Sequence, residues 1–150
     1  MSLPRKLLAA ARLPGADRLR LIEATLWLGL ARWAIVCLPF RRIAPQLGQH
    51  MAESPPEVDE EAQAKLAGVA RAVRIMSRHV PWGSKCLDQA IAAHMMLHRR
   101  GLPGTLYLGV AKAGEAELEA HAWERSGPFY ITGGRGRQQY TVVATFAWER

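Results

Sequence analysis

The chain has 150 residues, 49% of them hydrophobic, which predicts a single domain (1–150) with its own core and leaves no room for a second catalytic domain. The formal net charge of +7 predicts attraction to an anionic partner, but the basic residues are scattered and form no nucleic-acid-binding motif, so no nucleic-acid partner is expected. The two cysteines, Cys37 and Cys86, form neither a zinc pattern nor a disulfide framework and fit a reducing, cytoplasmic compartment.

Residues 1–56 predict an N-terminal helical segment. A short basic amphipathic pattern at 3–13 is followed by Asp17, which we expect to cap a helix over 18–38. Several prolines and a glycine then predict a loop that runs to about residue 57.

The most apolar stretch of the chain, residues 24–40, is too short for a membrane span, which needs about 20 residues, and it contains Arg32. We therefore interpret it as a core helix, in which Cys37 would be a buried, small hydrophobic residue. Arginines flank this stretch, so peripheral contact with a membrane surface remains an alternative.

Residues 57–150 predict a catalytic core of class α+β. A helix is expected over 58–79, and a second helix begins near Cys86 and ends before Gly101. After Gly101 the apolar residues no longer recur every three or four positions, as in a helix, but every second position, as in a strand. This change predicts an antiparallel sheet with the helix of Cys86 packed on it. The expected strands are 105–110, 118–125, 129–132 and 140–148.

Cys86 is the candidate nucleophile because it stands where a helix begins. The hydroxyl of Ser84 is expected to cap the first turn, which would place the thiol at the positive end of the helix dipole. Lys85 adds a positive charge, and both features favour the thiolate that attacks carbonyl groups.

His121 is the candidate general base for Cys86. It lies on a predicted strand and shares one face of that strand with Trp123. A cysteine at a helix start followed by a histidine on a later strand is the order found in papain-like and transglutaminase-like enzymes. Trp82, just before the helix, either covers the thiol pocket together with Trp123 or packs between two helices.

His94 and His98, one turn apart, have the spacing of two metal ligands, but no third ligand is visible in the sequence. We therefore interpret them as part of a solvated helix face. Neither a metal nor another cofactor is expected.

The motif PWGSKCLDQAIAAHMMLHRRGLPGTLYLGV followed by AHAW resembles the B-type leader peptidases of lasso-peptide biosynthesis. These bacterial enzymes mature ribosomally made peptides and have a transglutaminase-like, papain-like cysteine protease core. Cys86 and His121 match the catalytic motif of this family. The resemblance implies a cysteine peptidase that removes the leader from a lasso precursor. Its implied partners are the precursor peptide, a small leader-binding protein and an ATP-dependent lasso cyclase.

The third catalytic group is not evident in the sequence. In the family that the motif resembles, an acidic residue follows the histidine by about a dozen positions, but this chain has no Asp after Asp88. The candidates for orienting His121 are Glu124, Thr132 and Gln139. Glu124 is three residues along the same strand and should point to the opposite face.

Two other functions remain open. One is a transglutaminase-like amide hydrolase or acyl transferase that acts on another substrate. The other is a catalytically weak scaffold for the lasso cyclase, in which Cys86 would be dispensable.

Overall fold

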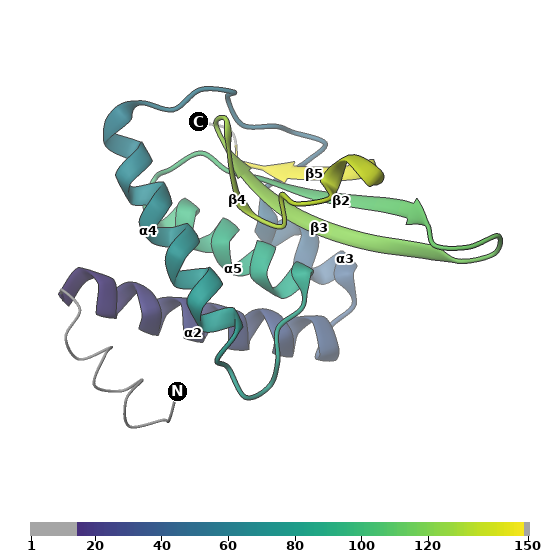
Figure 1. Cartoon of the computed structure of the whole chain (residues 1–150), viewed down its shortest axis with the longest axis horizontal. Coiled ribbons are helices and arrows are strands. Elements are labelled where there is room, and N and C mark those ends of the chain that lie inside the picture. The colour runs from purple at the N-terminus through teal and green to yellow at the C-terminus, as the bar shows by residue number, and fades with distance from the viewer. Residues whose placement is uncertain (1–14, 149–150) are drawn as a thin grey trace.

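The computed structural model describes residues 15–148 and has the predicted α+β fold (Figure 1). Three long helices lie on one side of a five-stranded sheet: α2 (Gly15–Cys37), α4 (Glu60–Ser77) and α5 (Cys86–Arg99). Asp59 caps α4, because its side chain accepts a hydrogen bond from the N–H of Ala62 at 2.7 Å. The predicted helix at 3–13 lies outside the described residues.

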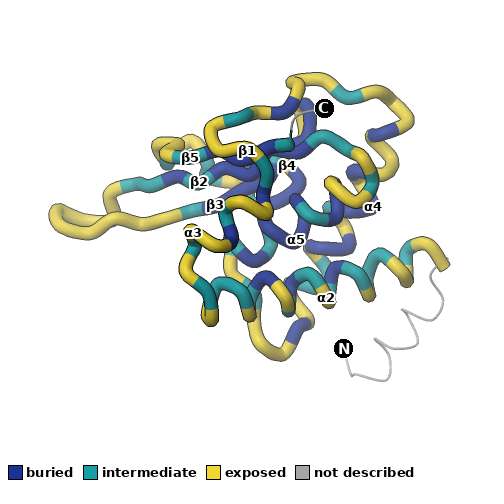
Figure 2. Tube along the Cα trace, turned by 180° about the vertical axis from the view of Figure 1, so that it is seen from behind, coloured by how far each residue is buried: buried dark blue, intermediate teal, exposed yellow. Residues whose placement is uncertain are grey.

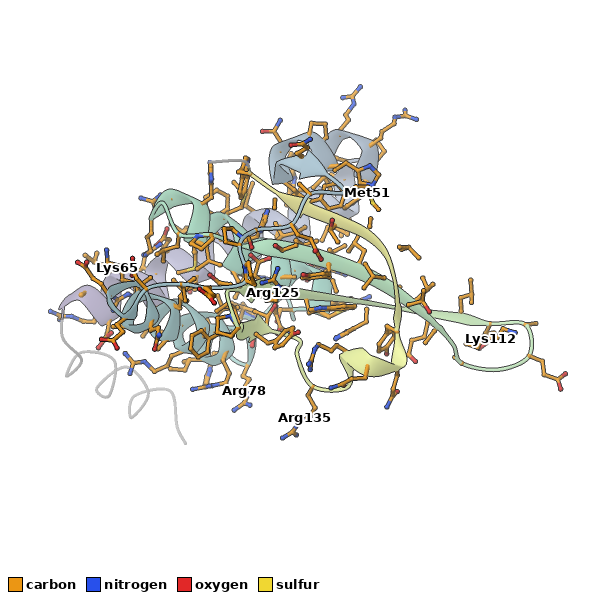
Figure 3. The ribbon with its side chains drawn as sticks, turned by 90° about the horizontal axis from the view of Figure 1, so that it is seen from above. Met51, Lys65, Arg78, Lys112, Arg125 and Arg135 are labelled. Carbon is orange, nitrogen blue, oxygen red and sulfur yellow. The ribbon has the colours of Figure 1, made fainter. Side chains whose placement is uncertain are left out.

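The four predicted strands are confirmed to within two residues at each end. They are β2 (Thr105–Lys112), β3 (Leu118–Ser126), β4 (Phe129–Thr132) and β5 (Thr141–Ala147). A fifth, short strand is β1 (Gln49–His50). Every neighbouring pair is antiparallel, and the order across the sheet is β1-β5-β2-β3-β4. In Figure 3, Lys112 lies on the β2–β3 hairpin, which extends beyond the rest of the molecule.

The predicted loop between the first two long helices has structure of its own. It contains α3 (Phe40–Ile43), a 3₁₀ helix (Ala44–Leu47) and a short strand, β1 (Gln49–His50), which pairs with β5. This segment therefore extends the sheet. Arg125 of β3 connects the next part of the loop to the sheet by donating a hydrogen bond to the carbonyl oxygen of Ser54 at 3.2 Å.

Helix α5 is the centre of the fold, between the sheet on one side and α2 and α4 on the other (Figures 1 and 2). Small and apolar residues allow this close packing, since Ala90, Ala92, Ala93, Met96 and Leu97 are completely buried. Because α5 is packed on nearly all sides, it cannot shift relative to the sheet and to α2 and α4. These elements therefore determine where Cys86, the first residue of α5, lies.

Helix α2 buries only one side against the core, through Ala24, Leu28 and Ala31. Its other side exposes a line of apolar residues: Leu19, Ile22, Leu26, Leu30, Trp33 and Val36. None of the helices within residues 15–148 is long and apolar enough to cross a membrane.

Two expectations about α2 are wrong. The helix begins at Gly15, so Asp17 does not cap it but lies in its first turn, where its carboxylate is 3.0 Å from Arg20 and 2.7 Å from Arg71. Cys37 is exposed rather than buried, because it is the last residue of the helix, next to the exposed apolar line.

Candidate active site

Cys86 is the first residue of α5 and is half-buried. Lys85 is the N-cap residue, and its backbone N–H donates a hydrogen bond to Oδ2 of Asp88 at 2.9 Å. The expected cap by Ser84 is wrong, because its hydroxyl donates to the carbonyl oxygen of Ser77 instead. The thiol nevertheless stands at the N-terminus of a 14-residue helix, where backbone N–H groups lack partners within the helix.

Asp88 also links the start of α5 to α2. It is 1% exposed, and Oδ2 lies 3.9 Å from the guanidinium of Arg32. Arg32, which is unfavourable for a membrane span, is thus a counter-charge for a buried carboxylate. The ion pair and the cap bond together hold the first turn of α5, and therefore Cys86, against the helical layer.

His121 is on β3, and its Nε2 lies 2.8 Å from the carbonyl oxygen of Gly133. A carbonyl oxygen can only accept, so Nε2 carries a hydrogen and donates it. In the neutral ring, Nδ1 then has the free lone pair and is the atom that can take a proton. Among the described residues, this bond to Gly133 is the only hydrogen bond of the His121 ring.

Two aromatic rings hold His121 further in place. The ring of Trp123 stacks at a centroid distance of 5.6 Å, and the ring of Tyr140 lies at 4.9 Å. The pKa of Tyr140 is raised, first by desolvation and then by the Glu119 carboxylate and the neighbouring Cys86. Tyr140 is thus a direct neighbour of His121.

Cys86 and His121 line the same pocket, which has a volume of about 390 Å³. Apart from these two residues, its walls are apolar: Ile35, Leu38 and Phe40 on the helical side face Leu108, Val110 and Ala120 of the sheet. No hydrogen bond joins Cys86 to His121 within the described part of the chain. Strand parity places the His121 ring with Trp123 on the face of β3 that points away from α5, so a hydrogen bond to Cys86 requires the ring to turn toward the start of α5 when substrate binds.

A larger cavity, of about 850 Å³, lies between the segments 49–55 and 101–104. Neither Cys86 nor His121 lines it, so it is not the candidate active site. Trp82 and Trp123 do not line the pocket of Cys86 either. Trp82 lies against Gly29 of α2, where a Cβ would be 3.3 Å from the indole.

Glu124 faces away from His121, as strand parity predicts. It is completely buried on the side of α5, where its two carboxylate oxygens lie 2.9 and 3.0 Å from Nδ1 of His94. His94 is therefore not on a solvated face: it is completely buried, and its Nε2 lies 2.8 Å from the carbonyl oxygen of Leu47. His98 stacks on Trp148.

Burial is the largest influence on the pKa of both members of this pair. It raises the pKa of Glu124, and the charges of His94 and Arg125 offset this only in part. Burial by itself would lower the pKa of His94, but the Glu124 carboxylate and the hydrogen bonds to Glu124 and Leu47 outweigh it and raise that pKa. The pair therefore keeps a proton to higher pH than its separate groups would.

Neither of the other two candidates for the third group forms a hydrogen bond with the His121 ring among the described residues. Thr132 lies on β4 opposite Glu124, and its buried hydroxyl has no hydrogen-bond partner among the described residues. Gln139 is exposed in the short 3₁₀ helix Arg137–Gln139. Across residues 15–148, no group of three His, Cys, Asp or Glu residues could hold a metal ion.

Gly133 and Tyr140 are the site residues that sequence reasoning missed. Gly133 is the twelfth residue after His121, at the distance where the acidic residue of the resembled family is expected. Gly133 contributes its backbone carbonyl oxygen, which accepts the hydrogen bond from His121. Every residue has this group, so the residue type gives no indication of the role. The sequence pattern indicates only that Tyr140 begins a strand.

A cysteine at the start of a helix that packs on an antiparallel sheet, with a histidine on the second strand after it, is the order found in transglutaminase-like folds. A family model agrees with this fold. The chain belongs to the transglutaminase-like superfamily, whose model matches residues 34–145. No curated protein and no solved structure matched the chain.

The range matched by the family model, residues 34–145, begins inside α2. It therefore starts before the predicted boundary between residues 1–56 and 57–150, and that division stays a prediction.

Proposed function

We propose that this protein is a cysteine peptidase that removes the leader peptide from a lasso-peptide precursor. The observation that carries the proposal is that Cys86 and His121 line one pocket while Gly133 holds Nε2 of His121. This arrangement leaves Nδ1 as the base. Membership of the transglutaminase-like superfamily supports the acyl-transfer chemistry, and the CLDQA and HAW motifs support the choice of substrate.

In the first half of the reaction, Nδ1 of His121 takes the proton of the Cys86 thiol, and the sulfur attacks the carbonyl carbon of the last leader residue. The backbone N–H of Cys86 stabilises the oxyanion. The C–N bond then breaks, and the imidazolium of His121 gives its proton to the leaving amine. The leader remains on Cys86 as a thioester.

In the second half, a water molecule attacks the thioester while Nδ1 of His121 takes one of its protons. The C–S bond breaks, the leader leaves with a free carboxyl group, and the thiol is regenerated. The hydrogen bond from Nε2 to Gly133 in the resting enzyme leaves Nδ1 as the ring atom that exchanges protons.

The split type of lasso system implies the remaining partners. We propose that a separate leader-binding protein brings the precursor to Cys86 and that an ATP-dependent cyclase takes the released core peptide. Recruitment of this kind raises the local concentration of substrate without any new contact at the site.

The test is single-turnover cleavage of the precursor peptide encoded by a short reading frame beside this gene, with and without the adjacent leader-binding protein. We expect cleavage at one bond, a transient acyl group on Cys86 in the intact mass, and faster cleavage with the partner. Transfer of the acyl group to added glycinamide in preference to water would favour an acyl transferase. Lasso product formed equally well by Cys86→Ala would favour the scaffold.

A further inference from the structure

The pocket beside Cys86 is much more apolar than a site for peptide backbone alone requires. Its helical wall comes from the end of α2 and from α3, with Ile35, Leu38 and Phe40. Its other wall is formed by the sheet, where Leu108 and Val110 lie on β2. Apart from Cys86 and His121, no residue of the lining carries a polar side chain.

Several of these apolar residues are only partly covered by the rest of the chain. Val143 on the rim is 52% exposed, and Ile35, Leu38, Phe40 and Leu108 are half-buried. Apolar surface in a concave site gains free energy when an apolar group removes it from water. A volume of about 390 Å³ lies within the range for small-ligand pockets and has room for a substrate side chain.

We propose that this pocket is a specificity subsite that binds an aliphatic or aromatic side chain of the substrate, within two residues of the attacked carbonyl on the acyl side. The inference rests on the proposed function, because it takes Cys86 as the nucleophile. Only the acyl half of the substrate stays bonded to sulfur while water enters. A subsite for that half therefore acts in both halves of the reaction.

The test uses dipeptide chloromethyl ketones, in which the Cys86 sulfur displaces chloride and the residues on the acyl side can be varied. The protein carries Cys37→Ser, because Cys37 is exposed and would also react. Probes with Leu or Phe at either position are compared with Gly-Gly and with Asp-containing probes. Each rate is divided by the rate of alkylation by iodoacetamide. We expect Leu or Phe at one position to raise the ratio about 10- to 100-fold over Gly.

Two adjacent valines provide a matched pair of variants. Val142 and Val143 are both exposed on β5, at 44% and 52%, but only Val143 lines the pocket. Val143→Asn should lower the preference for Leu and Phe roughly ten-fold, the scale of about 1.4 kcal/mol. Val142→Asn should leave the preference unchanged. A neutral polar residue is used so that no new charge acts on the thiol.

A third variant fills the pocket. Ala120 is exposed and lines the pocket from β3, where phenylalanine is well accepted by a strand. Ala120→Phe should lower the rate with Leu and Phe probes more than the rate with Gly-Gly.

The outcomes separate this inference from the proposed function. If iodoacetamide labels Cys86 but Leu, Phe, Gly and Asp probes react at equal relative rates, the subsite is overturned and the nucleophile stands. An equal effect of Val142→Asn and Val143→Asn also overturns the subsite. If no reagent labels Cys86 in the folded protein, both the nucleophile and the subsite are overturned.

Discussion

Nε2 of His121 donates a hydrogen bond to the carbonyl oxygen of Gly133, 2.8 Å away. The residue twelve positions after the histidine therefore does orient the His121 ring, but through its backbone carbonyl group instead of a side-chain carboxylate. A carbonyl oxygen fixes the tautomer of the ring as well as a carboxylate does, while it stabilises the imidazolium less because it carries no full charge. We therefore expect a correctly oriented base that supports a slower reaction than a full triad.

Substitution of Gly133 by alanine should disrupt this arrangement. Gly133 has a φ of +65°, and an added Cβ would lie 2.6 Å from the carbonyl oxygen of Ala122 and 3.3 Å from Nε2 of His121. The loop must shift, and His121 must shift with it. We expect Gly133→Ala to lower single-turnover cleavage by about 100-fold, the scale of a misplacement of about 1 Å.

Gly136 offers a control with the same kind of backbone conformation. Its φ is +80°, but an added Cβ would meet nothing within 4 Å. Gly136→Ala should therefore cost only the left-handed conformation, about 1–2 kcal/mol of stability, and keep activity within a few-fold. Comparable losses of activity in both variants, at equal folded fractions, would show that the Gly133 carbonyl has no special part.

The buried pair of His94 and Glu124 should make stability depend on pH. Nε2 of His94 donates to the carbonyl oxygen of Leu47, so Nδ1 and the carboxyl group of Glu124 share one proton. Both pKa values are raised, so the folded protein keeps this proton to a higher pH than the unfolded chain, which loses it near about pH 6.5. The stabilisation of the folded state by this shared proton is fully present below about pH 6.5 and is lost as the pH rises through the raised pKa of the pair in the folded protein.

Urea unfolding between pH 6 and pH 9 measures this contribution. We expect the free energy of unfolding of the wild type to fall over this range, and that of Glu124→Gln to fall less. At pH 6 the variant should be less stable by about 1–3 kcal/mol, since His94 loses a charged partner. Glu115→Gln, an exposed carboxylate on the β2–β3 hairpin, is the control. Parallel curves for wild type and Glu124→Gln would contradict the shared proton.

The α+β class and the strands were predictable because local patterns determine them. Apolar and polar residues alternate over 118–125, as in a strand with one buried and one exposed face. The observed strand β3 has these bounds to within one residue. The helix of Cys86 was predictable from its apolar spacing and from Gly101 after its end. These signals lie within a few residues of one another, so no tertiary information was needed.

The parts that sequence reasoning missed depend on contacts between distant segments. His94 and His98 have the pattern of a solvated face, but His94 is buried because Glu124, thirty residues away, and the carbonyl oxygen of Leu47 satisfy it. Cys37 lies in an apolar run, yet it is exposed because α2 packs on the core with its other side. Such pairings follow from register and packing, which no short pattern encodes.

The exposed face of α2 makes the predicted membrane contact testable. Both carboxylates of this helix are already in ion pairs, Asp17 with Arg20 and Arg71, and Glu23 with Arg99 and Arg100. Each carboxylate has two arginine partners, so these ion-pair groups carry a net positive charge, which suits an anionic lipid surface. If the contact exists, the protein should sediment with vesicles that contain phosphatidylserine and be released by salt.

Two leucines of nearly equal exposure distinguish a specific contact of α2 from non-specific hydrophobic adsorption. Leu26 on α2 is 68% exposed, and Leu118 at the start of β3 is 71% exposed. Leu26→Glu should weaken vesicle binding roughly 10- to 100-fold, the free energy of burying one leucine, while Leu118→Glu should not. Equal binding of both variants, or no binding at low salt, would contradict a membrane contact of α2.

The last prediction concerns the role of Glu124. Cys86→Ala and His121→Ala should each abolish single-turnover cleavage, because one removes the nucleophile and the other the base. Glu124→Gln should keep cleavage within a few-fold when it is assayed where the variant is fully folded. The reason is structural: Glu124 lies on the side of α5 and contacts His94, whereas His121 contacts Gly133.

Folding and activity have to be measured on the same samples, since Glu124→Gln also removes a buried charged partner. Circular dichroism and urea unfolding give the folded fraction of each variant, and rates are compared per folded molecule. A loss in Glu124→Gln as large as that in His121→Ala, at full folding, would show that Glu124 acts in catalysis. The ring of His121 would then have to reach Glu124 during the reaction, which requires its hydrogen bond to Gly133 to break.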